Sequence, residues 1–167
     1  MGGMLGQVIA SYYPSKINKL VLSCTHQGFA MSFRKPLRDP YFKRLDERKK
    51  MSDDEFGKLR AQNMVPHLKN KSILKILSSI SSEISINSIL CGGEAMQILD
   101  TTELLEKIIC PSLIISASED IVCNEGNAVF LNQKIKNSIR FNIEDAGHAP
   151  YCEKPELFND TVHQFLK

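Results

Sequence analysis

Three short runs of apolar residues, separated by amphipathic stretches, dominate the hydrophobic pattern of the chain. The runs are KLVLSCT (19–25), SLIISA (112–117) and SIRFNI (138–143). Their length and apolar character are typical of buried parallel strands. Amphipathic stretches at residues 124–135 and 154–167 follow the second and third runs. Strands that alternate with helices in this way indicate a parallel α/β sheet.

The first element is predicted to be a helix over residues 2–13. Gly2, Gly6 and Ala10 recur every four residues and form a stripe of small side chains. Such a stripe lets a helix lie close against a sheet. Pro14 is expected to end the helix, because proline lacks the backbone N–H that the next turn needs.

The last element is predicted to be an amphipathic helix over residues 154–167, with Pro155 near its first turn. Its apolar positions fall on one face at helical spacing and are Phe158, Val162, Phe165 and Leu166.

From about residue 34 to residue 99 the pattern changes to polar sequence with a helical period. Ser52 begins a capping-box pattern, with Glu55 three residues later. Further amphipathic stretches cover residues 71–80 and 94–108. Because this region has few glycines and prolines and many apolar positions, we interpret it as a helical insertion rather than a linker.

Composition and charge change this picture little. The 167 residues are 43% hydrophobic and 24% charged, with a net charge of +2, which suits a globular protein and favours no class of partner. Residues 34–60 hold ten basic and six acidic side chains, but the signs are interspersed, which favours a solvated helical face over a nucleic-acid surface. No apolar run reaches the ~18 residues of a membrane span.

The five cysteines form no CxxC pair, and no cluster of histidine, cysteine and aspartate has metal spacing. We therefore expect reduced thiols, no bound metal, and a cytoplasmic location without a signal peptide.

Two loops carry the candidate chemistry, because each follows a predicted strand at its carboxyl end, where open α/β sheets bind ligands. Asp120 lies in ASEDIVC and His148 lies in EDAGHAPYCEKPE. A carboxylate beside an imidazole fixes its tautomer and stabilises the imidazolium, while the histidine moves protons. Two alternatives stay open: Glu119 in place of Asp120, and His148 as an ordinary loop histidine. His26 is interpreted as a loop or pocket-wall residue.

The chain resembles the C-terminal part of the α/β-hydrolase family in the order of its features, which is PSLIISASED, then AGHAPYCEKPELF, then a last helix. In that family the catalytic triad runs serine, then aspartate or glutamate, then histidine. The opening MGGM resembles the residues that follow the serine in a G-x-S-x-G nucleophile elbow, so the serine would stand directly before Met1. The nearest branch is the small esterases and enol-lactone hydrolases.

The resemblance implies the organisation of the chain and its site. Residues 1–33 would hold the elbow helix and first core strand, residues 34–99 a cap over the active site, and residues 100–167 the rest of the core. Asp120 and His148 would be catalytic. The elbow and oxyanion positions would be Met1, Gly2 and Gly3, with the Met1 N–H as an oxyanion donor.

The expected activity is hydrolysis of a small-molecule ester or lactone, with no cofactor, no nucleic acid and no membrane. The chain as given carries the acid and the base but not the serine, so we expect it to be inactive alone. An N-terminal half, either on another chain or upstream of a mis-called start, would complete it, or the apolar edge of the first strand would drive self-association. The alternatives are a non-catalytic remnant or pseudoenzyme that binds a ligand, and an unrelated α/β binding domain.

Overall fold

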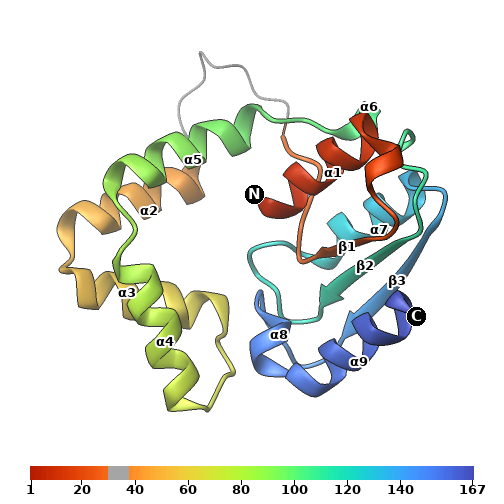
Figure 1. Cartoon of the computed structure of the whole chain (residues 1–167). Coiled ribbons are helices and arrows are strands. Elements are labelled where there is room, and N and C mark those ends of the chain that lie inside the picture. The colour runs from red at the N-terminus through yellow and green to blue at the C-terminus, as the bar shows by residue number, and fades with distance from the viewer. Residues whose placement is uncertain (30–37) are drawn as a thin grey trace. The chain divides into compact units, whose positions relative to one another are not determined.

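The computed structural model describes residues 1–29 and 38–167 (Figure 1). These residues divide into two compact units. The α/β unit comprises Met1–Gly28 and Asp100–Lys167, and the helical unit comprises Phe29–Leu99. The boundary predicted between residues 33 and 34, and the first four residues of the predicted insertion, lie outside the described residues.

A three-stranded parallel sheet forms the centre of the α/β unit (Figure 1). Its strands are β1 (Leu20–Ser23), β2 (Ser112–Ala117) and β3 (Ser138–Ile143), in the order β1-β2-β3. All six residues of β2 are buried, as expected for a central strand with helices on both faces. The predicted fold class is confirmed, and the bounds predicted for the second and third strands match, whereas β1 is three residues shorter than its apolar run.

Helices cover both faces of the sheet and bury its two sets of alternating side chains. On one face lie α1 (Gly2–Tyr12), α6 (Thr102–Leu105) and α7 (Glu125–Lys134). The buried residues there are Ala10, Leu22, Leu105, Ile108, Cys110, Ile114, Ala128, Leu131 and Ile135. α9 (Pro155–Leu166) packs on the other face through Phe158, Val162 and Phe165. Three of the four apolar positions predicted for this helix are confirmed, whereas Leu166 is 53% exposed.

The small-residue stripe of α1 differs from the prediction at its first position. A Cβ added at Gly3 would lie 2.5 Å from Thr25 Oγ1, and one at Gly6 would lie 3.5 Å from Leu20 Cδ1. A Cβ added at Gly2 would meet nothing within 4 Å. The close approach of α1 to the segment after β1 therefore depends on Gly3, because a helix advances about 100° per residue and Gly2 points elsewhere. The helix ends at Tyr12, and the 3₁₀ turn Pro14–Lys16 follows it.

The helical unit contains α2 (Asp39–Lys50), α3 (Asp53–Met64), α4 (Lys71–Ser82) and α5 (Ile86–Ile98). Leu45, Phe56 and Ile89 form a buried cluster between them. Within the described part of the chain, no single helix is long and apolar enough to cross a membrane. Only α4 and α5 together reach the length and composition of a span, and they are bent by 90°.

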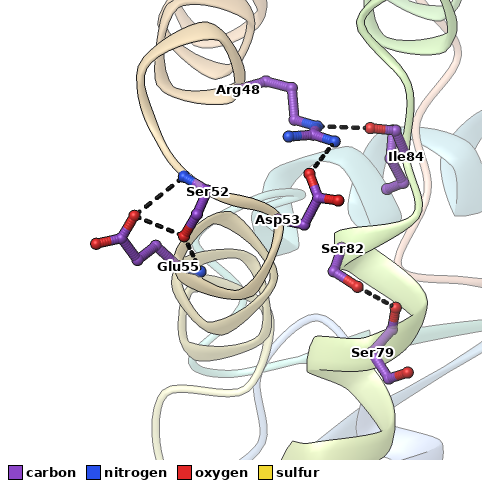
Figure 2. Close-up of polar contacts among 7 residues, drawn as sticks. All are labelled: Arg48, Ser52, Asp53, Glu55, Ser79, Ser82 and Ile84. Atoms are coloured by element: carbon purple, nitrogen blue, oxygen red, sulfur yellow. Dashed lines mark hydrogen bonds and ion pairs between the residues drawn. The ribbon is translucent and has the colours of Figure 1, made fainter.

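The predicted capping box at the start of α3 is confirmed (Figure 2). The Ser52 hydroxyl accepts a hydrogen bond from the Glu55 N–H (3.4 Å), and Glu55 Oε2 accepts one from the Ser52 N–H (3.0 Å). Beside it, Arg48 Nη2 pairs with Asp53 Oδ1 (2.7 Å), and Arg48 Nε donates to the Ile84 carbonyl (2.8 Å) (Figure 2). These contacts join the end of α2 to the start of α3 and to the turn between α4 and α5.

Candidate active site

Backbone hydrogen bonds hold the loops after β2 and β3 side by side. The Ser118 N–H donates to the Ile143 carbonyl (3.0 Å), and the Glu119 N–H donates to the Ala146 carbonyl (2.9 Å). The Ser118 hydroxyl accepts from the Asp145 N–H (2.9 Å). Because these bonds continue the pairing of β2 with β3 past the strand ends, the residues that follow the two strands meet at one edge of the sheet.

The structure brings Asp120 and His148 together at this edge. His148 Nδ1 and Asp120 Oδ2 are 2.9 Å apart. The Asp120 side chain has no exposed surface, whereas the His148 side chain is 26% exposed. An ionised carboxylate can only accept, so Nδ1 carries the shared proton and the Nε2 lone pair of the neutral ring stays available to accept another.

The surroundings of Asp120 keep its carboxylate ionised. Burial alone would raise the pKa of Asp120, but the hydrogen bond from His148 and those from the Cys123 and Val122 N–H groups outweigh it and hold the pKa below its ordinary value. Both N–H groups donate to Oδ1 at 2.8 Å. They fix the carboxylate so that Oδ2 faces the histidine.

A short helix that the sequence analysis did not predict supports the His148 loop. This helix is α8 (Pro150–Glu153), and its last residue accepts a hydrogen bond at Glu153 Oε2 from the Gly147 N–H (2.6 Å). Pro150 at its first turn was a signal that could have indicated it, because proline favours that position.

The predicted elbow positions lie at the start of α1. Met1 is the N-cap residue, Gly2 is the first helical residue, and Gly3 is the position that packs against Thr25. Burial and the charge of Asp120 raise the pKa of the Cys123 thiol to about 12. Because Gly3 lies against Thr25, the residue after Cys24, the start of α1 lies beside the segment that follows β1.

Cys24 is a residue of this edge that the sequence analysis missed. It directly follows β1, its N–H donates to the Ile115 carbonyl (2.9 Å), and its backbone has φ 47°. One donor atom from each of Cys24, Asp120 and His148 lies within 4.8 Å of the other two. The sequence analysis placed Cys24 inside the first predicted strand (19–25), and its place near the carboxyl end of that run was the available signal. The sequence showed no metal spacing because these three residues are far apart along the chain, and only the parallel sheet gathers them.

A buried polar network lies under α1 and gives His26 a structural role. Gln7 Nε2 donates to the His26 carbonyl (3.2 Å), and Gln7 Oε1 accepts from the Thr101 hydroxyl. His26 is 9% exposed, and its Nδ1 accepts from the Gly28 N–H (3.0 Å). The ring thus stabilises the turn after β1.

Comparisons with known proteins show the family and the fold of the chain. A family model described as the alpha/beta hydrolase fold matches residues 1–155. The chain is 23% identical, over its full length, to a pimeloyl-[acyl-carrier protein] methyl ester esterase of Neisseria meningitidis serogroup B. It is also 25% identical over 99% of its length to the proline iminopeptidase PfmaB of Pestalotiopsis fici. These matches cover 66% and 64% of the two relatives.

Solved structures show the same fold. The enol-lactonase from Burkholderia xenovorans LB400 superimposes with a TM-score of 0.85 and 18% identity, covering 99% of this chain and 62% of that one. A thermophilic esterase from Thermogutta terrifontis gives a TM-score of 0.79 at 18% identity, covering 99% and 61%. The chain therefore spans less than two thirds of the length of each of these relatives.

Proposed function

The chain belongs to the α/β-hydrolase fold family, and from this premise we propose that it carries the acid and the base of an enzyme that hydrolyses small carboxylic esters or lactones. The observation that carries the proposal is the 2.9 Å pairing of His148 Nδ1 with Asp120 Oδ2 at the carboxyl ends of adjacent strands. The substrate class is supported by relatives described as a methyl ester esterase, an esterase and an enol-lactonase.

In this proposal His148 moves the protons and Asp120 orients it. Nε2 of His148 takes the proton of a serine hydroxyl as its oxygen attacks the ester carbonyl carbon, and the imidazolium then gives that proton to the departing alcohol. Water repeats the sequence on the acyl-enzyme and releases the acid. The buried Asp120 carboxylate, held by two backbone N–H groups, stabilises the imidazolium throughout.

We propose that the serine lies on polypeptide that precedes Met1 in the complete protein. Three observations support this: the MGGM sequence at the start of α1, the contact of Gly3 with Thr25 beside the end of β1, and relatives of which the chain spans 61–66%. Within residues 1–29 and 38–167, no serine or threonine hydroxyl is hydrogen-bonded to His148. In the completed protein the backbone N–H of Met1 would face the oxyanion.

The exposed side of α1 and the edge of β1 are where we propose that the N-terminal half packs. In the described sheet β1 pairs with β2 and forms an edge. On α1, Leu5, Ile9 and Tyr12 are between 47% and 63% exposed. A further strand beside β1 would pair its free backbone groups, and its helices would cover this apolar face. The helical unit is proposed to act as the cap that shapes substrate choice.

The proposed setting is the cytoplasm with no cofactor. All five cysteines, which lie in the described residues, are free, as suits a reducing compartment.

The test of this function is the hydrolysis of p-nitrophenyl acetate by the chain joined to its own upstream polypeptide. Asp120→Asn should lower kcat on the order of 10⁴-fold and His148→Ala on the order of 10⁶-fold, with KM nearly unchanged, because both residues act on the reaction rather than on binding. Asp160→Asn and His163→Ala remove the same groups from exposed positions on α9 and should retain activity.

Two outcomes would reject the proposal. Full activity in His148→Ala would show that another group moves the proton. No hydrolysis by the complete protein, for a range of simple esters and lactones, would favour the alternative of a non-catalytic binding module.

A further inference from the structure

Three metal-binding types of side chain converge from the ends of three strands: Cys24 after β1, Asp120 after β2 and His148 after β3. The donor atoms of this cluster lie within 4.8 Å of one another. We propose that Cys24, Asp120 and His148 form a binding site for a divalent transition metal ion of the zinc type, and that the bound ion holds the site inactive. The inhibition rests on the proposed function, whereas the metal site does not.

The donor set suits zinc in both chemistry and spacing. Thiolate sulfur, imidazole nitrogen and carboxylate oxygen are its usual ligands, and tetrahedral bonds of about 2.0–2.3 Å place ligand atoms roughly 3.3–3.6 Å apart. In the structure Asp120 Oδ2 and His148 Nδ1 are 2.9 Å apart, and no pair in the cluster exceeds 4.8 Å. Side-chain movements of about one ångström would therefore bring the three donor atoms to bonding positions.

The backbone around the cluster preorganises it. The Val122 and Cys123 N–H groups occupy Oδ1 of Asp120 and leave Oδ2 directed toward His148. Cys24 is held at φ 47°, a backbone conformation that residues with a Cβ rarely adopt, by its hydrogen bond to β2. The partly exposed His148 ring provides an entry path, and a water molecule can serve as the fourth ligand.

Metal binding would change the protonation of two ligands. The Cys24 thiol loses its proton to solvent, and the proton on Nδ1 of neutral His148 is replaced by one on Nε2, so one proton is released per ion. With Nε2 protonated and Nδ1 on the metal, the imidazole can no longer accept a proton from serine. The ion thus blocks the base of the proposed reaction.

The decisive experiment is titration of the chain with Co²⁺, followed by absorption spectroscopy without substrate. Thiolate bound to Co²⁺ gives a near-ultraviolet charge-transfer band, and a tetrahedral site gives strong visible bands. We expect both in the wild-type chain and in Cys91→Ser, which removes an exposed thiol of the helical unit. Cys24→Ser should lose the charge-transfer band. Absence of the band from the wild type, or its survival in Cys24→Ser, overturns the proposal.

A second measurement uses only the wild-type chain and does not depend on how the variant folds. Zn²⁺ should slow the alkylation of Cys24 by iodoacetamide at least tenfold, measured by mass spectrometry, and should leave Cys91 unchanged. Equal labelling of Cys24 with and without Zn²⁺ overturns the site. In the completed enzyme, Zn²⁺ should inhibit ester hydrolysis, and EDTA should restore the activity. If Zn²⁺ binds without inhibiting hydrolysis, the inhibitory role is overturned. If the enzyme is active but binds no metal, the metal site is overturned and the proposed hydrolase function stands.

Discussion

The α/β unit and the helical unit are stabilised by contacts of different range along the chain. In the α/β unit, β2 pairs with strands 92 and 26 residues away, as in Leu20↔Ser112 and Ser112↔Ser138, and is buried along its whole length. The helical unit has many contacts between near neighbours, including the Ser52–Glu55 capping box and ion pairs four residues apart. The candidate site depends on the long-range contacts of the α/β unit, since its residues come together only through the sheet.

This difference shows why the two units yield different information from sequence. Capping and helical period depend on residues three or four positions apart, so they can be identified locally. A site built at strand ends depends on strand order and register, which arise from distant residues.

The largest stability effect is expected in the centre of the sheet. Ile114→Ala should lower the free energy of unfolding by about 2–5 kcal/mol, because Ile114 is 1% exposed and its loss leaves a cavity between β2 and the helices of one face. Ile80→Ala, at a residue of α4 that is 61% exposed, should change it by less than about 0.5 kcal/mol. Urea denaturation measures both, and similar losses for the two variants would contradict the comparison.

A smaller effect on stability is expected where α3 packs closely against α4 at Gly57, and it tests whether the helical unit also depends on contacts between residues far apart along the chain. The Cβ of Gly57→Ala would overlap the Ser78 carbonyl oxygen of α4, so this substitution should lower the free energy of unfolding by about 1–3 kcal/mol. Gly3→Ala should lower the free energy of unfolding by a similar amount, because its Cβ would overlap the Thr25 side chain. Gly2→Ala is the control, since its Cβ meets nothing within 4 Å, and thermal denaturation should show no loss. A stable Gly57→Ala would mean that α3 and α4 pack less closely than the structure shows.

Removing the capping box tests the local stabilisation of the helical unit. Ser52→Ala should cost about 1 kcal/mol, because the Glu55 N–H loses its acceptor. Hydrogen exchange should speed up in the first turn of α3 and stay unchanged in β2. Ser79→Ala, at an exposed position within α4, is the matched control. Faster exchange throughout the chain would show that the cap is not a local feature.

The smallest effect concerns the stability of the α/β unit in acid. Because the pKa of Asp120 is lower in the folded state than in the unfolded chain, its contribution is present above about pH 4 and is lost as the pH falls through the folded pKa. In Asp120→Asn the free energy of unfolding should therefore fall less steeply as the pH is lowered below about 4, whereas exposed Asp160→Asn should leave this pH dependence unchanged. An unchanged acid limb in Asp120→Asn would mean that its hydrogen bonds do not favour the ionised form.

Much of the fold follows from local sequence pattern. The bounds of β2 and β3, the end of α1 before Pro14 and the capping box were all predicted correctly, because each depends on a short window of apolar, proline or capping residues. The helix α8 was missed because four residues are too few to show a period. The small-residue stripe was predicted to begin at Gly2, whereas the close approach is at Gly3, because a repeat of small residues does not fix which side of the helix faces its neighbour.

The sequence by itself determined that Asp120 and His148 follow successive strands, and the resemblance of their loops to a known family led to their pairing as a prediction. Only the tertiary structure decided that Cys24 joins them and that two N–H groups fix the Asp120 carboxylate. The physical reason is that parallel pairing places the carboxyl ends of three strands at one edge, and the positions of side chains there depend on register and loop conformation.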